Sequence, residues 1–189
     1  LWQAIRTALA ARGVETPVAL DRDIDIWELW RHPEMILAQT CGLPFRRELH
    51  KSVNLVASPV YDIACEGGYY YSVIVARQDD TRQTLADFDG ARLAFNDDFS
   101  QSGWIASKEW AAREGIEFGS YYQTGAHAVS AQAVADGKAD VATIDAVTWK
   151  LLQRWSPDAA ALKELGQTTP TPATPYISGP GIDAQLMAQ

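Results

Sequence analysis

Hydrophobic residues recur along this 189-residue chain in two alternating patterns. Stretches with apolar residues every three or four positions predict helices, whereas short continuous apolar runs predict buried strands. The helical stretches are residues 1–12, 24–31, 84–90, 102–115, 127–137 and 146–155. The strand-like runs are residues 35–40, 53–61, 67–77, 91–96, 117–125 and 140–145. This alternation predicts an α/β protein with mainly parallel sheets flanked by helices.

Two features of the middle of the chain favour two lobes over a single doubly wound sheet. Residues 69–83 form a run long enough to leave one sheet and enter another, and residues 166–177 are rich in Pro and Thr, as in a stiffened crossing strand. We therefore expect lobe 1 to comprise residues 1–75 plus 168–189, and lobe 2 to comprise residues 76–167. The abrupt first and last helical patterns lead us to expect that the chain is part of a longer one.

The charge of the chain narrows the choice of partners. Asp and Glu number 24 against 16 Lys and Arg, which gives a formal net charge of −8. No basic cluster is present, so nucleic acid and anionic membranes are poor partners. The two cysteines and three scattered histidines have no metal-ligand spacing, and we expect neither a metal nor another cofactor.

The junction after the run 91–96 carries the first candidate site. Ser100, Gln101, Ser102 and Gly103 stand between this strand and the next helix. Serine is a favoured N-cap in any helix, so capping alone explains the hydroxyls. The unpaired N–H groups and the partial positive charge of a helix start can instead bind an anion, with the two hydroxyls as added donors. Both interpretations stay open at this point.

Two further strand-to-helix junctions carry polar residues. Thr124 precedes a helix that begins near His127, whose imidazole can donate a hydrogen bond to an oxyanion. Asp145 ends the run 140–145 and begins the next helix, where it is either an N-cap or an acceptor for a ligand. Ligands of parallel sheets gather beyond the carboxyl ends of the strands, so the three junctions could face one site.

Aromatic residues provide candidates for another wall of the site. Strand alternation sends Tyr70 and Tyr71 to opposite sides of the run 67–77, and we expect at least one of them to reach a cleft between the lobes. Half-buried sheet positions would suit both tyrosines equally well. Trp104 and Trp149 lie in helices beside the candidate junctions, either lining a cleft for an organic ligand or packing in the core.

Several motifs together resemble a known family. The segments LAQTCGLPF, ASPVYDIACEGGYYYSVIVAR, LADFDGARLAFNDDFSQSG, TGAHAVSAQAVADGKADVATIDAVTW and PTPATPYI are similar to the phosphonate-type periplasmic substrate-binding proteins of ABC transporters. The resemblance extends from about residue 35 to residue 177. It implies a type 2 periplasmic-binding-protein fold, in which two α/β lobes joined by two crossing strands close on a ligand.

The resemblance also implies roles for the candidate residues. The turn at residues 100–103 would hold the oxygens of a phosphonate or phosphate, with Gln101 where the family often has a small hydroxyl residue. His127 matches the pocket histidine, and Thr124 matches the residue pair before it. A pocket tyrosine maps onto Tyr70 or Tyr71, and Asp145 could match a carboxylate that binds a ligand amine. No second acidic residue occurs between residues 168 and 176, so the match to amine-binding members is incomplete.

The family further implies a non-enzymatic monomer that is exported to the periplasm and delivers its ligand to a membrane permease. In an exported protein, Cys41 and Cys65 are expected to form a disulfide. A first alternative is an enzyme that uses Cys41, His127 and Asp145 as nucleophile, base and orienting group. A second alternative is the sensing domain of a receptor or regulator with the same fold, and a third is a binding protein for another small organic ligand.

Overall fold

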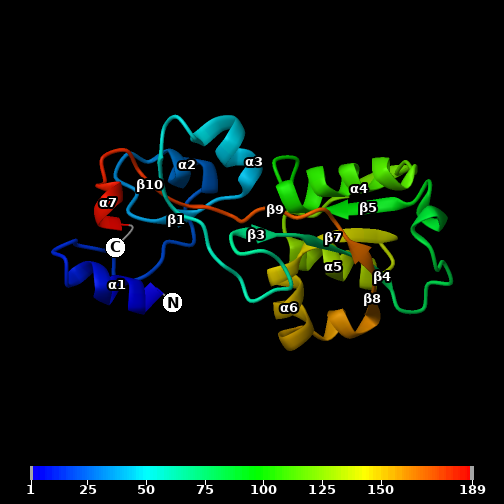
Figure 1. Ribbon diagram of the computed structural model, residues 1–189. Coiled ribbons are helices and arrows are strands. Elements are labelled where there is room, and N and C mark those ends of the chain that lie inside the picture. Colours follow the sequence, from blue (N-terminus) through cyan, green and yellow to red (C-terminus); the bar gives the residue numbers. More distant parts are fainter. Residues whose placement is uncertain (1, 188–189) are drawn as a thin grey trace. The chain divides into compact units, whose positions relative to one another are not determined.

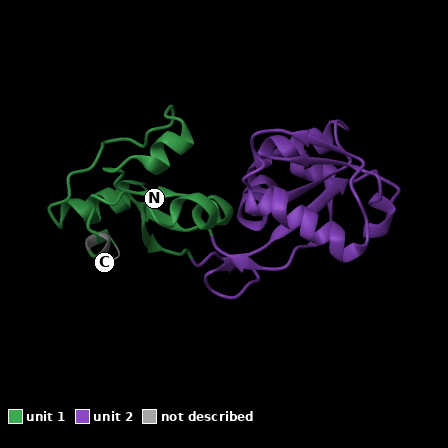
Figure 2. Cartoon of the chain, turned by 90° about the horizontal axis from the view of Figure 1, so that it is seen from above, with its two compact units in different colours: residues 1–59, 174–189 green, residues 60–173 purple. Residues whose placement is uncertain are grey.

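The computed structural model describes residues 2–187, which fold into two compact units. Unit 1 is formed by residues 1–59 and 174–189, and unit 2 by residues 60–173 (Figure 2). The sequence analysis predicts the first boundary at 75/76, later than the observed 59/60, and the second at 167/168, earlier than the observed 173/174. The difference arises because strand β4 (Ser72–Arg77) pairs along its length with two other strands of unit 2 and is an interior strand of its sheet.

Unit 2 is a mixed α/β unit. Its strands are β3 (Tyr69–Tyr70), β4, β5 (Arg92–Phe95), β6 (Ser120–Gln123), β7 (Val141–Asp145), β8 (Leu162–Gln167) and β9 (Thr171–Pro172). Its helical segments are η2 (Leu85–Phe88), η3 (Gln101–Ile105), α4 (Ala106–Glu114), α5 (His127–Ala135), α6 (Ala146–Trp155) and η4 (Pro157–Ala161). The short strands β3 and β9 pair with each other, and the other five strands form one sheet.

The five-stranded sheet has the order β6-β5-β7-β4-β8. Strand β5 runs parallel to both β6 and β7, whereas β4 runs antiparallel to its neighbours β7 and β8. Four strands therefore share one direction, and the prediction of a mainly parallel sheet is confirmed.

Helices cover both faces of this sheet. Helix α4 lies on one face, and α5 and α6 lie on the other (Figure 1). The strand residues alternate accordingly: Val73 and Val75 of β4 join the core beneath α5 and α6, whereas Ile74 and Ala76 join the core beneath α4. Both faces are apolar because both are covered, which explains why the strands read as continuous hydrophobic runs.

Unit 1 is smaller and contains more irregular segments. Its elements are α1 (Trp2–Ala10), α2 (Ile26–Arg31), β1 (Ala38–Gln39), α3 (Gly42–Pro44), η1 (Phe45–Leu49), β2 (Asn54–Ala57), β10 (Tyr176–Ser178) and α7 (Ala184–Met187). The three strands form an antiparallel sheet of order β1-β10-β2, over a core that contains Trp30, Met35, Leu49 and Ile177. The expected strand at residues 35–40 retains only two strand residues, and the helical segments at residues 42–49 were not predicted.

The expected disulfide is not formed in the structure. Cys41 stands immediately before α3 in unit 1, whereas Cys65 lies in unit 2 before β3, so the bond would have to join the two units.

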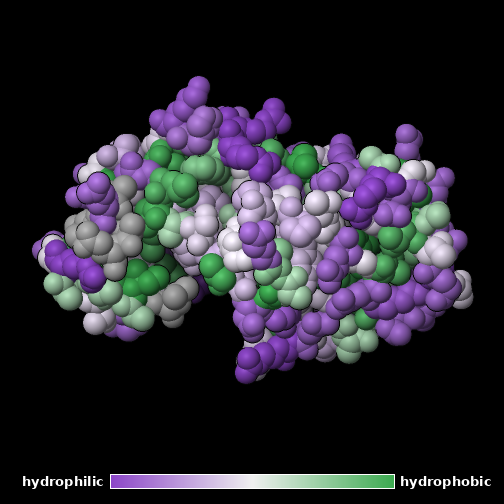
Figure 3. Space-filling model, viewed as in Figure 1, coloured by the Kyte–Doolittle hydropathy of each residue, from purple (hydrophilic) through white to green (hydrophobic). Residues whose placement is uncertain are grey.

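Hydrophilic and intermediate residues cover most of the face of unit 2 that is drawn at the right of Figure 3. Within residues 2–187, no helix combines the length and apolar character that a membrane crossing requires.

Candidate functional site

Three helix starts gather at one edge of the sheet of unit 2. Strands β6, β5 and β7 are neighbours and point the same way, and each leads into a helix: β5 into η3 and α4, β6 into α5, and β7 into α6. The carboxyl ends of parallel strands meet at one edge, and helix starts carry unpaired N–H groups. The sequence-predicted residues Ser102, His127 and Asp145 all belong to these three junctions.

The first junction is buried and is capped by its own serine. Ser100 is the N-cap of η3, and its Oγ accepts a hydrogen bond from the Gly103 N–H at 2.9 Å. Ser100, Gln101 and Ser102 are all buried. The capping interpretation is therefore correct, but it does not exclude a ligand, because the Ser100 hydroxyl hydrogen is not consumed by accepting a bond.

Ser102 is joined to the second junction by a short hydrogen bond. Its Oγ lies 2.8 Å from Nε2 of His127, the first residue of α5. The N-cap of α5 is Ala126, which offers no side-chain cap, so the first N–H groups of this helix have no capping oxygen. Burial lowers the pKa of His127, and the carboxylate of Asp145 only partly opposes this effect, so the ring is neutral at pH 7.

The third junction places a carboxylate beside the imidazole. Asp145 Oδ1 caps α6 by accepting from the N–H groups of Val147 at 3.1 Å and Thr148 at 2.9 Å. Its other oxygen, Oδ2, lies 3.6 Å from His127 Nε2. Asp145 is thus an N-cap through one oxygen, while the other faces His127; a ligand contact by this second oxygen stays a prediction.

This cluster does not have the geometry of a Ser-His-Asp triad. In a triad the serine and the carboxylate contact different ring nitrogens, so that a proton taken at one nitrogen is stabilised from the other. Here Ser102 and Asp145 both approach Nε2, while Nδ1 of His127 is buried and has no hydrogen-bond partner among the described residues. The Asp145 carboxylate is therefore not placed to stabilise, through Nδ1, a proton taken from the Ser102 hydroxyl.

Three other sequence-predicted residues, Thr124, Tyr70 and Tyr71, contact other parts of unit 2 and have a structural role there. Thr124 Oγ1 lies 3.0 Å from the Phe95 carbonyl and 2.6 Å from Ser130 Oγ, so it ties the end of β6 to β5 and α5. Tyr71 belongs to the core beneath α5 and α6. Tyr70 is buried in β3, beside β9. A ligand contact by Thr124, Tyr70 or Tyr71 stays a prediction.

The two tryptophans that could have lined a cleft pack within unit 2. Trp149 is buried in the core beneath α5 and α6, and its indole N–H donates to Glu164 at 2.6 Å. Trp104 packs against Phe95 and Tyr121, with the Lys108 ammonium 4.0 Å from its ring centroid. Both positions favour the packing alternative for these residues.

The sequence analysis missed three residues that surround the cluster. Ser72 and Thr143 donate from the sheet to carbonyls of the first junction, and Asn96 lies so close to Gly103 that a Cβ there would be 2.0 Å from Asn96 Oδ1. Asn96 follows β5 directly, and a polar residue at the end of the apolar run 91–96 was a signal that could have been used. Ser72 and Thr143 lie inside apolar runs, and the only signal in the sequence is that each is a polar residue among apolar ones.

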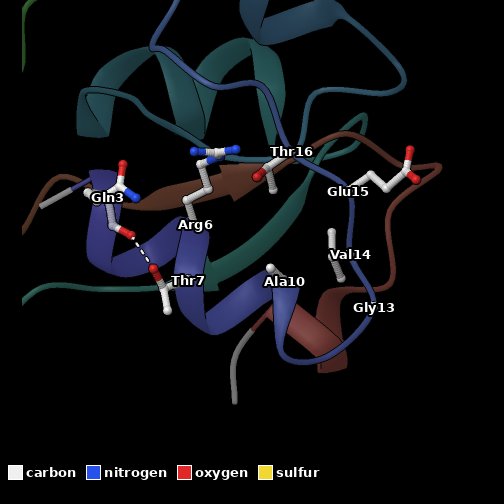
Figure 4. Close-up of a pocket in the computed structure, with 8 residues that line it drawn as sticks. All are labelled: Gln3, Arg6, Thr7, Ala10, Gly13, Val14, Glu15 and Thr16. Carbon is white, nitrogen blue, oxygen red and sulfur yellow. Dashed lines mark hydrogen bonds between the residues drawn. The ribbon is translucent and has the colours of Figure 1, made fainter.

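A separate pocket lies in unit 1 against α1 (Figure 4). Its volume is about 690 Å³, and it is lined by Gln3, Arg6, Thr7, Ala10, Gly13, Val14, Glu15 and Thr16. Thr7 is already bonded to the Gln3 carbonyl at 2.9 Å. None of the sequence-predicted site residues lines this pocket. Across residues 2–187, no three His, Cys, Asp or Glu side chains come together as a potential metal site.

Solved structures share this fold. PhnD1 from Prochlorococcus marinus, in complex with methylphosphonate, matches with a TM-score of 0.77 and 16% identity over 100% of this chain and 73% of that chain. XAC2383 from Xanthomonas citri, bound to ATP, matches with a TM-score of 0.70 and 16% identity over 98% of this chain and 74% of that chain. A binding protein component of an ABC phosphonate transporter from Pseudomonas aeruginosa matches with a TM-score of 0.67 and 18% identity over 97% of this chain and 66% of that chain.

At these identities the structural matches show a periplasmic-binding-protein fold and no more. Over the XAC2383 structure bound to chloride, the chain covers 56% of the other protein's length. A comparison with curated protein sequences gave no match. The family model described as "ABC transporter, phosphonate, periplasmic substrate-binding protein" matches residues 35–189, most of the chain, and confirms the resemblance read from the sequence. The chain therefore belongs to the phosphonate periplasmic substrate-binding proteins of ABC transporters.

Proposed function

We propose that this protein binds a small phosphonate or phosphate oxyanion and delivers it to the permease of an ABC importer in the periplasm. The observation that carries the proposal is the meeting of three helix starts at Ser102, His127 and Asp145, with atoms 2.8 and 3.6 Å apart. Helix starts and hydroxyls bind anions without a formal positive charge. This mode of binding fits a chain with a net charge of −8.

The proposed contacts follow from the donors at the site. With the proton of His127 on Nε2, the tautomer that the nearby Asp145 carboxylate favours, the imidazole donates and the Ser102 hydroxyl hydrogen is available. Ser100 and Ser102 would then bind the oxygens of the anion, together with N–H groups at the starts of η3 and α5. Gln101 and Gly103 would shape the turn, and Tyr70 or Tyr71 and Thr124 would contact the ligand at its edge.

Asp145 would select among oxyanions. A carboxylate so close to the bound anion repels it, unless the ligand supplies a donor such as a P–OH group or an ammonium. Phosphonates and phosphate carry such a proton near neutral pH, whereas a sulfonate does not. We therefore expect the protein to prefer methylphosphonate, phosphite or phosphate to methanesulfonate.

The proposal is tested by titration calorimetry with these four anions and an aminoalkylphosphonate. Ser102→Ala and His127→Ala should each weaken binding by about tenfold or more, since a hydrogen bond to a charged group contributes about 1.5–3 kcal/mol. The control is Ser120→Ala, at the opposite end of β6, where the hydroxyl only accepts from exposed Arg92 at 3.3 Å. Unchanged affinity in both site variants for every anion that binds would refute the site.

A sensing role is the second candidate. A histidine kinase sensor domain matches the chain with a TM-score of 0.61 and 17% identity, so the same fold serves in receptors. An amino-acid transporter's binding protein matches equally well, which shows that fold alone does not select the ligand. The sequence that flanks residues 1–189 in the gene distinguishes transport from sensing, because a sensor domain is joined to a signalling domain.

A further inference from the structure

Two buried hydroxyls lie beneath the first junction, on the sheet face that α4 covers. Ser72 Oγ of β4 donates to the Ser102 carbonyl at 3.0 Å, and Thr143 Oγ1 of β7 donates to the Gly103 carbonyl at 3.0 Å. Their residues are 1% and 0% exposed. We name residues 100–103 the serine turn, and these two bonds join it to the sheet.

The location of these hydroxyls is unusual for a core. Ile74 and Val141 continue the same face of β4 and β7 and pack in the apolar core beneath α4. Valine has nearly the shape of threonine and would fill the Thr143 position without a polar atom. A buried hydroxyl destabilises the fold unless it is bonded, so its presence here is explained by the bond that it makes.

The two bonds fix consecutive peptide groups of the serine turn. The peptide that joins Ser102 to Gly103 is held at its oxygen by Ser72 and at its N–H by Ser100 Oγ, at 2.9 Å. The next peptide is held at its oxygen by Thr143 and at its N–H, that of Trp104, by the Ser100 carbonyl at 3.3 Å. The first of these peptides adjoins the Cα of Ser102, so fixing it restricts the backbone from which the Ser102 side chain reaches His127.

The turn also departs from ordinary helix geometry at these residues. Residues Gln101–Ile105 are π-helical, with the Ile105 N–H bonded to the Ser100 carbonyl at 3.1 Å. Isolated π-helical turns are rare and are frequent at functional sites. The wider turn therefore needs support from outside the helix, and the sheet hydroxyls supply it at Ser102 and Gly103.

We propose that Ser72 and Thr143 are positioning residues of the anion site. They hold the serine turn in its π-helical form, so that the hydroxyls of Ser100 and Ser102 point into the site and Ser102 stays within hydrogen-bond distance of His127. The proposal rests on the proposed oxyanion function for its effect on binding, but its effect on the Ser102–His127 bond is independent of any ligand.

Thr143→Val removes the hydroxyl and keeps the shape, and Thr143→Ser keeps the hydroxyl. By calorimetry, Thr143→Val should weaken methylphosphonate binding about tenfold, equivalent to about 1.4 kcal/mol, and Thr143→Ser should stay within about threefold of the wild type. Ser72→Ala should act in the same direction as Thr143→Val. The control is Ser107→Ala, which deletes another fully buried hydroxyl bonded to a helix carbonyl, Trp104 O at 2.7 Å, outside the serine turn. It should lower thermal stability and leave the affinity unchanged.

The ligand-free test is the nitrogen chemical shifts of the His127 ring, measured by NMR in the same variants. Thr143→Val and Ser72→Ala should shift the Nε2 resonance, and Ser107→Ala should not. A wild-type protein that binds no oxyanion would refute the proposed function, and the ring shifts would still decide the positioning role. Unchanged shifts in Thr143→Val and Ser72→Ala, or equal losses of affinity in Thr143→Val, Thr143→Ser and Ser107→Ala, would overturn it.

Discussion

Replacing Gly103 by alanine adds one methyl group, which has two opposing effects on the stability of the protein: a higher helix propensity and closer packing. Gly103 lies in the helical segment η3 without a left-handed backbone, and alanine in a helix is about 0.5–1 kcal/mol more stable than glycine. Intrinsic propensity alone therefore predicts that Gly103→Ala stabilises the protein.

Packing predicts the opposite outcome. The added Cβ would lie 2.0 Å from Asn96 Oδ1, 3.1 Å from Asn96 Cγ and 3.2 Å from His127 Cε1. The Asn96 oxygen has no hydrogen-bond partner among residues 2–187 and can rotate away, but the other two atoms must also shift by a few tenths of an ångström. Such overpacking typically costs about 1–3 kcal/mol. We expect a net loss of about 1 kcal/mol, which lowers the melting temperature by about 2–4 °C.

The assay is thermal unfolding, combined with calorimetric titration of methylphosphonate. Affinity should fall as well, because the methyl group displaces His127 from Ser102. Gly166→Ala is the matched control: the added Cβ would meet only Leu85 Cδ1, at an ordinary 3.8 Å, and should not destabilise the protein. Adding Asn96→Ala to Gly103→Ala should restore part of the lost stability, as a double-mutant cycle would measure. A Gly103→Ala protein that melts at or above the wild type, with unchanged affinity, would refute the reasoning.

Two predictions concern pH. Because burial lowers the pKa of His127 below its ordinary value of 6.5, the unfolded chain binds a proton below pH 6.5 that the native state does not. The free energy of unfolding should fall as pH drops below 6.5, by at most about 1.4 kcal/mol per pH unit, and His127→Gln should flatten this dependence in denaturant titrations. An identical slope in the variant would contradict the burial effect. At Asp80, the hydrogen bond from Arg82, at 2.6 Å, is the main cause that lowers the carboxyl pKa from 3.8 to about 2. Its stabilising contribution is present above pH 4 and lost as pH falls toward 2, so Asp80→Asn should make acid unfolding less steep; equal acid titration curves would exclude this contribution.

The positions of the candidate residues relative to secondary structure could be predicted from the sequence. Apolar runs that end in polar residues, followed by helical periodicity, placed Ser102, His127 and Asp145 at three strand-to-helix junctions. The direction of parallel strands then predicted a common edge, and the structure brings the three residues together there. Local patterns suffice for this because capping and periodicity are properties of short segments, and alternating strands and helices favour parallel strands.

Other features were decided by contacts between distant segments. The pairing of β4 with β7 and β8 moved the unit boundary, and core packing made Tyr71 a buried residue of unit 2. Helical structure at residues 42–49 escaped prediction because Pro44 and the short apolar run around it suggested the end of a strand.

The α/β architecture and the placement of the site's polar residues at helix starts follow from local patterns along the chain, since periodicity and capping depend only on neighbouring residues. The hydroxyls that support the site follow instead from the packing of distant segments. Ser72 and Thr143 reach carbonyls 30 and 40 residues away in the chain. Each bond depends on the sheet holding β4 and β7 beneath the serine turn, and no local pattern in the chain encodes that juxtaposition.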